Sequence, residues 1–232
     1  SLGEHYTSVT NIIKLINPLF MNSLNEQFDN CESEKDYEKL LRRIYSLKIF
    51  DPASGSGNFL IVTYKQLCQL EFKIFSSLQE INSSKWILAS IGIRASQFYA
   101  ITIQDFDAQI AKLSIYIAEH QMNQELSDIF GEVNPTLPFS NKLNIRVTNS
   151  LHEDWAQFLN IGDEEIYIIG NPPYIGSKKQ TNDQKNDMEL VFNSYEKYGN
   201  IDYVGCWFKV ASECINKNIK AAFVSTNSIV QG

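Results

Sequence analysis

The sequence has few cysteines and histidines, and neither type is spaced like a set of metal ligands. The cysteines are scattered with no C-x-x-C pair, and the histidines are isolated. This pattern argues against a zinc site and against a disulfide framework, so buried free thiols are expected. The residues concerned are Cys31, Cys68, Cys206, Cys214, His5, His120 and His152.

Long hydrophobic runs are also missing. The longest, around Phe59–Val62, is far shorter than the roughly 20 residues that a membrane-spanning helix needs. Residues Ser1–Thr10 are polar and lack the apolar core of a signal peptide. A cytoplasmic location without membrane contact is therefore expected.

Positive charge is scarce, since 20 Lys and Arg stand against 27 Asp and Glu, for a net charge of −7. DNA-binding proteins usually present a basic face, so the charge by itself argues against a nucleic-acid partner. The length of 232 residues and the 44% hydrophobic content are ordinary for a globular protein. One domain is expected.

Apolar and β-branched runs alternate with stretches in which apolar residues recur every three or four positions. The runs predict strands, and the second spacing predicts helices with one buried face. This alternation indicates an α/β fold with a mostly parallel sheet and helices on both faces. The expected strands are Leu47–Phe50, Tyr99–Ile103, Ile145–Thr148, Ile166–Ile169 and Ala221–Ser225. The expected helices are Asn11–Gln27, Glu34–Tyr45, Ser56–Leu78, Asp105–Met122 and Tyr203–Asn216, with a loop at Ser127–Lys142.

The first segment with a chemical pattern is DPASGSGNFL, residues 51–60, in which a strand ends in an acid and a small-residue turn leads into a helix. Glycines let the backbone pass close beneath a ligand, and the helix start offers unpaired N–H groups. Asp51 can accept a hydrogen bond from an ammonium or hydroxyl group. The segment therefore suits an amino-acid-like ligand. A purely structural turn is the alternative, because Leu60 stands where the dinucleotide fingerprint has its third glycine.

The second segment is Gly170-Asn171-Pro172-Pro173-Tyr174, again at the end of a predicted strand. Two consecutive prolines stiffen the backbone and set the direction of their carbonyls. A planar aromatic amine can donate to the Asn171 side-chain oxygen and the Pro172 carbonyl while Tyr174 stacks on its ring. The alternative is a rigid turn with an incidental asparagine.

These two segments resemble the cofactor and catalytic motifs of adenine-specific DNA methyltransferases. Their order along the chain and the upstream GEHYT, residues 3–7, resemble the γ group of that family. With VSTNSI, residues 224–229, they resemble large enzymes that fuse a methyltransferase to restriction and target-recognition regions. The resemblance spans essentially the whole chain. It implies a Rossmann-like S-adenosylmethionine-dependent methyltransferase fold and methyl transfer from S-adenosylmethionine to adenine N6 of a base flipped out of double-stranded DNA.

The resemblance also implies roles for individual residues. Asn171, Pro172 and Tyr174 would be the catalytic residues that hold the flipped base, and Pro173 would touch the cofactor. The methionine end of the cofactor would be lined by Thr7, Asp51, Ala53, Gly55 and Gly57.

The rest of the cofactor would lie against the neighbouring strand ends. Asn149, after the third strand, would face the cofactor's adenine. Trp207 would wall the same pocket, although a place in the core suits it equally well. At the position where the family usually has an acid for the ribose hydroxyls, this chain has Thr102, and Asp105 is the nearest substitute.

The resemblance implies that residues 1–232 are a methyltransferase catalytic domain whose residues 1–45 form an N-terminal helical segment. Lys178 and Lys179 follow the catalytic motif but add little basic charge. We therefore expect the target-recognition region and most of the DNA grip to lie in a part absent from this chain. Fused nuclease and target-recognition domains are compatible with the resemblance.

Three alternatives stay open at this point. The chain could methylate cytosine N4, although that group more often has Ser where Asn171 stands. It could methylate an amide in proteins or an amine in RNA, although such enzymes usually have a shorter path between the two motifs. It could also be a non-catalytic scaffold that kept the fold, which its acidic charge and Thr102 would allow.

Overall fold

The computed structural model describes residues 7–81, 91–131, 142–193, 195 and 198–226. Within these ranges no helix is both long enough and apolar enough to cross a membrane. The predicted upstream segment, residues 3–7, is described only at Thr7, and residues 227–229 of the segment 224–229 lie outside the described residues.

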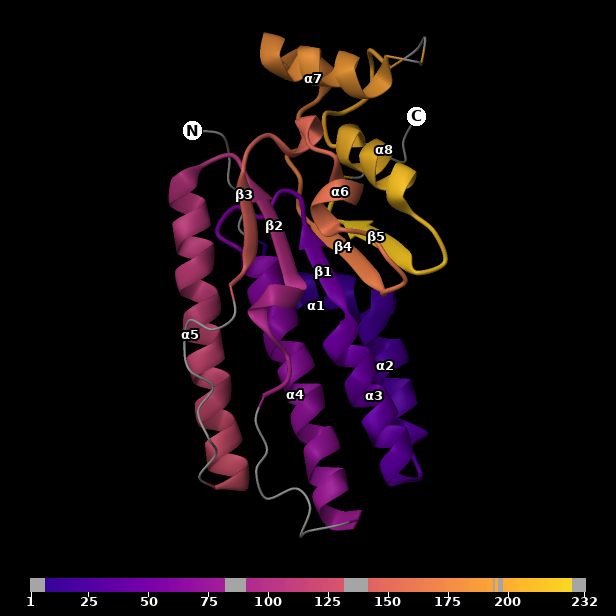
Figure 1. Ribbon diagram of the computed structural model, residues 1–232. Coiled ribbons are helices and arrows are strands. Elements are labelled where there is room, and N and C mark those ends of the chain that lie inside the picture. Colours follow the sequence, from indigo (N-terminus) through magenta and orange to yellow (C-terminus); the bar gives the residue numbers. More distant parts are fainter. Residues whose placement is uncertain (1–6, 82–90, 132–141, 194, 196–197, 227–232) are drawn as a thin grey trace.

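A parallel sheet of five strands forms the centre of the protein (Figure 1). The strands are β1 (Lys48–Asp51), β2 (Phe98–Thr102), β3 (Asn144–Val147), β4 (Ile166–Gly170) and β5 (Ile219–Phe223). Their order is β3-β2-β1-β4-β5, so β1 lies between β2 and β4 and the direction of strand addition reverses there. The predicted sheet type is confirmed. Ligands of such sheets bind at the carboxyl ends of the strands, near this reversal.

Helices cover both faces of the sheet, and one lies beyond its carboxyl edge (Figure 1). The helices are α1 (Val9–Ile16), α2 (Asn22–Asp29), α3 (Glu34–Ser46), α4 (Asn58–Ile81), α5 (Asp105–Phe130), α6 (Trp155–Leu159), α7 (Asn182–Phe192) and α8 (Gly205–Cys214). Helices α1 to α5 pack on one face, and α6 and α8 pack on the other. Helix α7 lies beyond the strand ends (Figure 1), and its Met188 and Phe192 belong to the core shared with α6 and α8.

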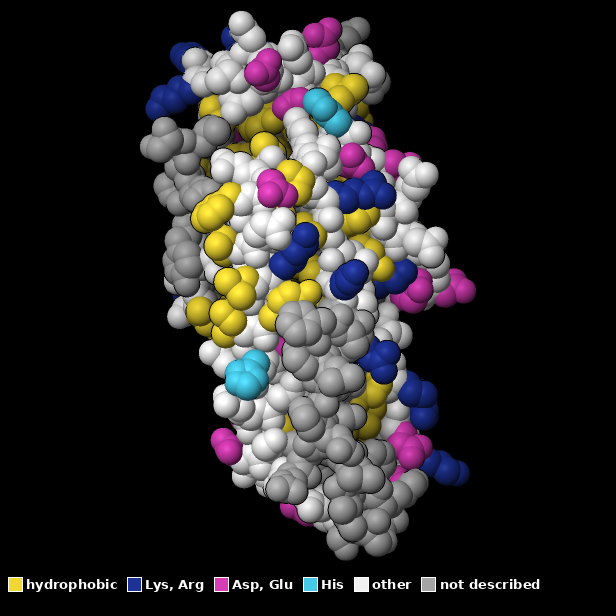
Figure 2. Space-filling view, turned by 60° about the vertical axis from the view of Figure 1, so that its left-hand side comes forward, with side chains coloured by type: hydrophobic (Ala, Val, Ile, Leu, Met, Phe, Trp, Pro, Cys, Tyr) yellow, Lys and Arg dark blue, Asp and Glu magenta, His cyan; other side chains and the backbone are white. Residues whose placement is uncertain are grey.

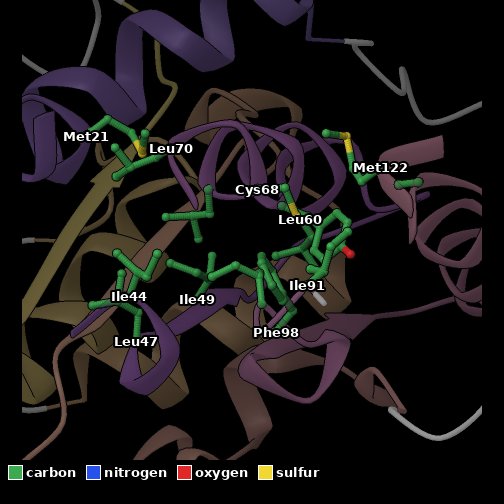
Figure 3. Packing of buried hydrophobic residues seen from close by; sticks show 14 of the residues in the cluster. Met21, Ile44, Leu47, Ile49, Leu60, Cys68, Leu70, Ile91, Phe98 and Met122 are labelled. Carbon is green, nitrogen blue, oxygen red and sulfur yellow. The ribbon is translucent and has the colours of Figure 1, made fainter. Parts of the chain in front are cut away.

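Each face of the sheet has its own hydrophobic core, because side chains alternate along a strand. Ile49 and Ile169 belong to the core beneath α1 to α5, and Figure 3 shows Ile49 there among residues from α3, α4 and β2. Phe50 and Ile168 belong to the opposite core, where Phe50 meets the edge of the Trp155 ring. The central strands are thus buried on both sides, as a parallel sheet requires.

Several element boundaries differ from the sequence predictions. The predicted helix Asn11–Gln27 is interrupted by a π-helical turn over Asn17–Met21, because Pro18 has no N–H to donate. Helix α5 continues to Phe130 with Leu126 buried, so the predicted loop Ser127–Lys142 was wrong at its start. Its residues 132–141 lie outside the described residues.

Other predictions were shifted or missed. Helix α4 begins at Asn58 instead of Ser56, since Gly57 has a φ of 87°. Helix α8 begins two residues after Tyr203, and β5 lies two residues before the predicted strand. Helices α6 and α7 were not predicted, because the first is short and the second is mostly polar. Of the thiols expected to be buried, Cys31 and Cys214 are only partly so.

One buried carboxyl makes stability depend on pH. The Glu71 side chain, 0% exposed, accepts hydrogen bonds from the Tyr45 hydroxyl and the Gly92 N–H, both at 2.6 Å. Burial raises its pKa to about 7. The folded pKa of Glu71 lies above its unfolded value of 4.5. The contribution of this carboxyl to the free energy of unfolding is therefore full below pH 4.5, and it falls by roughly 3 kcal/mol as the pH rises through about 7.

Glu71→Gln is therefore expected to lose less stability than the parent protein between pH 5 and pH 8. Urea unfolding at both pH values measures the difference. Glu80→Gln, an exposed position on the same helix α4, serves as the control and should behave like the parent. Equal pH dependence in Glu71→Gln and the parent would contradict the assignment.

Candidate active site

Both sequence motifs lie at the carboxyl edge of the sheet, on the adjacent strands β1 and β4. These strands pair in register, with Phe50 opposite Ile168, so the residues that follow them emerge side by side. The ends of β2 and β3 reach the same edge, because all strands are parallel. The parallel topology alone therefore gathers the candidate residues of four strands.

A tight turn connects β1 to α4. Gly55 and Gly57 have φ values of 47° and 87°, which residues other than glycine rarely adopt. A Cβ atom on Gly57 would lie 3.0 Å from that of Ala111, so this glycine also lets α5 pack against the turn. The Ser54 N–H donates to the Ile101 carbonyl of β2 at 3.0 Å. The turn is thus tied to both neighbouring elements.

Asp51 is the most unusual group of this turn. Its carboxylate is 1% exposed, and its Oδ1 accepts from the Ala53 N–H at 3.0 Å. Its Oδ2 is buried and has no hydrogen-bond partner among the described residues. Burial raises the pKa of the Asp51 carboxyl to about 7. A buried acceptor that lacks a donor is costly, and it fits a site that an ammonium or hydroxyl group completes.

The start of the catalytic motif touches this acid directly. A Cβ atom on Gly170 would lie 2.6 Å from Oδ1 of Asp51, so only a residue without a side chain allows the two strand ends to approach this closely. Pro172 is buried, Pro173 is exposed and Tyr174 is half-buried. The first motif and the second motif therefore form one site.

Thr7 joins the same site from the other end of the chain. Its hydroxyl oxygen accepts a hydrogen bond from Nδ2 of Asn171 at 3.0 Å, across 164 sequence positions. Thr7 is 9% exposed and directly precedes Ser8, whose side chain caps α1. Sequence reasoning had assigned Thr7 to the cofactor and had not linked it to Asn171.

The loop after the catalytic motif is anchored to the segment before α8. The Ile175 N–H donates to the Asp202 carboxylate at 2.8 Å, and the Tyr203 N–H donates to the Ile175 carbonyl at 3.0 Å. The Gln180 side-chain amide donates to the carbonyls of Ile175 and Ile201. These bonds hold the loop that carries Asn171 in one conformation.

The end of β2 offers a hydroxyl, a carboxylate and apolar surface. Thr102 is 5% exposed, whereas Asp105 is exposed in the first turn of α5. Asp105 can therefore reach a bound ligand more easily than Thr102. Ile103 and Phe106 are more than 70% exposed beside it, and Figure 2 shows hydrophobic side chains gathered on this face. These two residues were missed, because hydrophobic residues near a strand end usually indicate core.

The end of β3 carries a polar cluster that the sequence analysis also missed. The Asn149 Oδ1 accepts from the Leu151 N–H, and its Nδ2 donates to Asp187 of α7 at 3.1 Å. The buried Asp187 carboxylate also binds Nε2 of His152 and the Tyr203 hydroxyl. The cluster ties α7 to the sheet edge and turns the Asn149 amide toward this helix.

Trp207 lies in the core between the sheet and α8. It is 3% exposed and meets the Tyr203 ring edge-to-face at 5.2 Å. Its indole nitrogen is buried and makes no hydrogen bond with a described residue. Of the two interpretations given to this tryptophan, the core position is the one these contacts describe.

Within the described residues, no group of three or more His, Cys, Asp or Glu side chains could hold a metal ion.

Comparison with known proteins gives the site its context. The family model for the DNA-methyltransferase domain of MmeI matches residues 26–232. The chain belongs to this family.

Two relatives support the assignment to the MmeI methyltransferase family over the full length of the chain. DNA methyltransferase A of Bacillus subtilis (strain 168) is 46% identical over 235 residues, which cover all of this chain and 26% of that protein. The solved structure of the type IIL restriction–modification enzyme MmeI with DNA is 39% identical, with a TM-score of 0.92 over 100% of this chain and 31% of that one. This chain is thus similar to about a quarter to a third of each relative.

A more distant structure shares the fold alone. The ATP-dependent type ISP enzyme LlaBIII, solved bound to DNA, is 16% identical with a TM-score of 0.57 over 98% of this chain. The methyltransferase fold and the resemblance to methyltransferases of restriction–modification enzymes, both expected from the sequence, are confirmed.

Proposed function

We propose that this domain transfers a methyl group from S-adenosylmethionine to N6 of an adenine flipped out of double-stranded DNA, as part of a longer restriction–modification enzyme. One observation carries the proposal. The glycine turn after Asp51 and the Asn171–Tyr174 motif lie in contact, with Gly170 directly against the Asp51 carboxylate. A methyl donor bound at the first and an amine bound at the second would therefore be neighbours.

The residues around Asp51 fit the amino-acid end of this cofactor. The buried Oδ2 of Asp51, which has no hydrogen-bond partner among the described residues, suits the cofactor ammonium, and the start of α4 suits its carboxylate. We propose that Asp105, exposed in the first turn of α5, accepts from the ribose hydroxyls and that exposed Ile103 offers apolar surface to the adenine ring. When bound, the cofactor supplies a methyl group on a positively charged sulfur.

The cofactor contacts assigned to Asn149 and Trp207 receive less support. Both hydrogen-bonding ends of the Asn149 amide are engaged, by Leu151 and by Asp187. Trp207 is buried against Tyr203. We therefore propose that Asn149 shapes the adenine pocket chiefly by holding α7 over the sheet edge, and that Trp207 supports the pocket from the core.

Asn171 and Pro172 prepare the amine for attack. The N6 lone pair of adenine is delocalised into the ring, which makes it a poor nucleophile. The Asn171 side-chain oxygen and the Pro172 carbonyl accept hydrogen bonds from the two N–H groups of the amine. These bonds orient the amine and free its lone pair. Tyr174 stacks on the base. No strong base is needed, because the methylated ammonium is acidic enough to lose its proton.

DNA has to be held mostly by regions outside this chain. Its charge of −7 repels phosphate, yet flipping a base out of the duplex costs a few kcal/mol that other contacts must supply. MmeI, three tenths of which this chain covers, was solved in complex with DNA. We propose that target recognition resides in the corresponding additional regions, and that any fused nuclease does as well.

Identification of the methylated nucleoside tests the proposal. The full-length protein is incubated with DNA of varied sequence and isotopically labelled cofactor, and the digested product is analysed by mass spectrometry. N6-methyladenine is the expected product. Detection of N4-methylcytosine would identify cytosine as the substrate base instead of adenine, since cytosine presents the same kind of planar amine. Label found only in protein or RNA would contradict DNA as the substrate.

A further inference from the structure

The bond between Thr7 and Asn171 has a chemical consequence beyond holding two segments together. A primary amide carries an acceptor oxygen at one end and an NH₂ donor at the other. The Asn171 Nδ2 donates to the Thr7 hydroxyl oxygen at 3.0 Å, and Thr7 is almost completely buried. A hydroxyl can both donate and accept, so Thr7 selects the NH₂ end of the amide once its own hydrogen is engaged elsewhere.

We propose that Thr7 is a positioning residue that sets the polarity of the Asn171 amide. With Nδ2 directed to Thr7, the planar amide directs Oδ1 to the opposite side. An acceptor at that place matches an exocyclic amine, whose hydrogens both need acceptors. The reversed amide would present N–H groups to the N–H groups of the substrate, and it would repel them. Thr7 thus makes the site specific for amines.

The same hydroxyl extends this effect toward the cofactor. Because the Thr7 oxygen accepts from Asn171, its own hydrogen is directed elsewhere and can donate to an anion. This step rests on the proposed function and on a cofactor carboxylate that reaches Thr7 as well as the start of α4. Hydrogen bonds then run in one direction, from Asn171 to Thr7 and from Thr7 to the carboxylate. Such chains polarise one another, so a bound cofactor strengthens the amide orientation that the amine needs.

The backbone around Asn171 does not provide this orientation by itself. Gly170, packed on Asp51, and the bonds of Ile175 to Asp202 and Tyr203 hold the loop on both sides of the motif. They position the backbone of Asn171 but leave rotation of its amide plane to side-chain contacts. A Thr7 hydroxyl whose hydrogen is engaged by the cofactor can only accept, and it therefore favours the amide orientation that turns Nδ2 toward residue 7.

The test uses the full-length protein with Thr7→Val, which keeps the shape of the side chain and removes the hydroxyl. Methyl transfer is measured with cofactor and DNA both saturating, so that weaker binding of either does not lower the rate. We expect kcat to fall about 10- to 100-fold, the range expected for the loss of one well-placed hydrogen bond to a buried group. Thr7→Ser should recover the parent rate to within about threefold.

Ser8→Ala is the matched control, because it removes the cap of α1 next to Thr7 without touching Asn171. Its kcat should stay near that of the parent. An equal loss in Ser8→Ala would show that the N-terminal segment acts only through its anchoring and would overturn the proposal. So would a Thr7→Val variant whose only defect is a raised KM for the cofactor.

A binding measurement separates this proposal from the proposed function. S-adenosylhomocysteine affinity is measured by calorimetry for Thr7→Val, Asn171→Ala and the double variant. Coupling through Thr7 predicts that Asn171→Ala weakens binding about threefold in the parent and not at all in Thr7→Val. If the loss of affinity in the double variant equals the product of the losses in the two single variants, the coupling is overturned. If the parent methylates another amine, only the DNA assignment fails, and the kcat series is repeated on that acceptor.

Discussion

Asn171→Ala is expected to lower methyl transfer by roughly 100- to 1000-fold, the loss typical of removing one preorganised group from a reacting centre. The side-chain oxygen of Asn171 is the acceptor that orients the substrate amine. Binding of S-adenosylhomocysteine should change by no more than about threefold, because Asn171 is assigned to the substrate amine and its bond to Thr7 links it to the cofactor indirectly. Single-turnover kinetics and calorimetry on the full-length protein measure the two effects.

The control for Asn171→Ala is Asn186→Ala, an exposed asparagine on α7. It should leave both the rate and the affinity unchanged. A rate of Asn171→Ala close to that of the parent would rule out the amide as a catalytic group. A large loss of cofactor affinity would instead place Asn171 in the cofactor site.

Asp51→Asn is expected to weaken S-adenosylhomocysteine binding about 10- to 100-fold, the scale of a charge-assisted hydrogen bond. The asparagine oxygen can still accept from the Ala53 N–H, so the turn should keep its shape. The neutral side chain, however, offers an amide donor where the buried Oδ2 would accept from the cofactor ammonium.

The parent protein should also bind this ligand more weakly as the pH falls. Burial raises the Asp51 pKa to about 7, so the carboxyl is mostly ionised at pH 8 and mostly protonated at pH 6. The ammonium needs the ionised form, which gives about tenfold weaker binding at pH 6. The Asp51→Asn variant should lack this dependence.

Calorimetry at both pH values, in buffers with different ionisation enthalpies, measures the affinity and the proton release that the parent should show below pH 7. Asp105→Ala removes a carboxylate that is exposed, and it should keep the pH dependence even if affinity drops. Affinity that is independent of pH in the parent would show that the buried Asp51 carboxyl does not receive the ammonium.

Much of the fold could be predicted because its strands are short apolar runs separated by amphipathic helices. β4 is buried along its whole length and its sequence is almost uniformly apolar, whereas β1 has the apolar pair Ile49 and Phe50 between Lys48 and Asp51. Helix α7 could not be predicted in this way, because only Asp187, Met188 and Phe192 of its residues are buried. A polar helix that covers a sheet edge has almost no periodic pattern to recognise.

The positions of the site residues relative to the predicted strands indicated some of the contacts between them but not others. Asp51 and Asn171 each follow a central strand, and a parallel sheet brings such residues together at one edge. Asp187, which engages Asn149, His152 and Tyr203, had no motif of its own. An aspartate on a polar helix looks solvated until its three partners are placed around it.

The fold class, the two motifs and the family they resemble could be predicted from the order of the residues, because these depend on local apolar periodicity and on short runs of residues. The contact of Gly170 with Asp51 and the bond from Asn171 to Thr7 across 164 positions became apparent from the folded chain. Such contacts depend on how the strands pair and where α1 docks. Those arrangements minimise the free energy of the whole chain, and no local pattern specifies them.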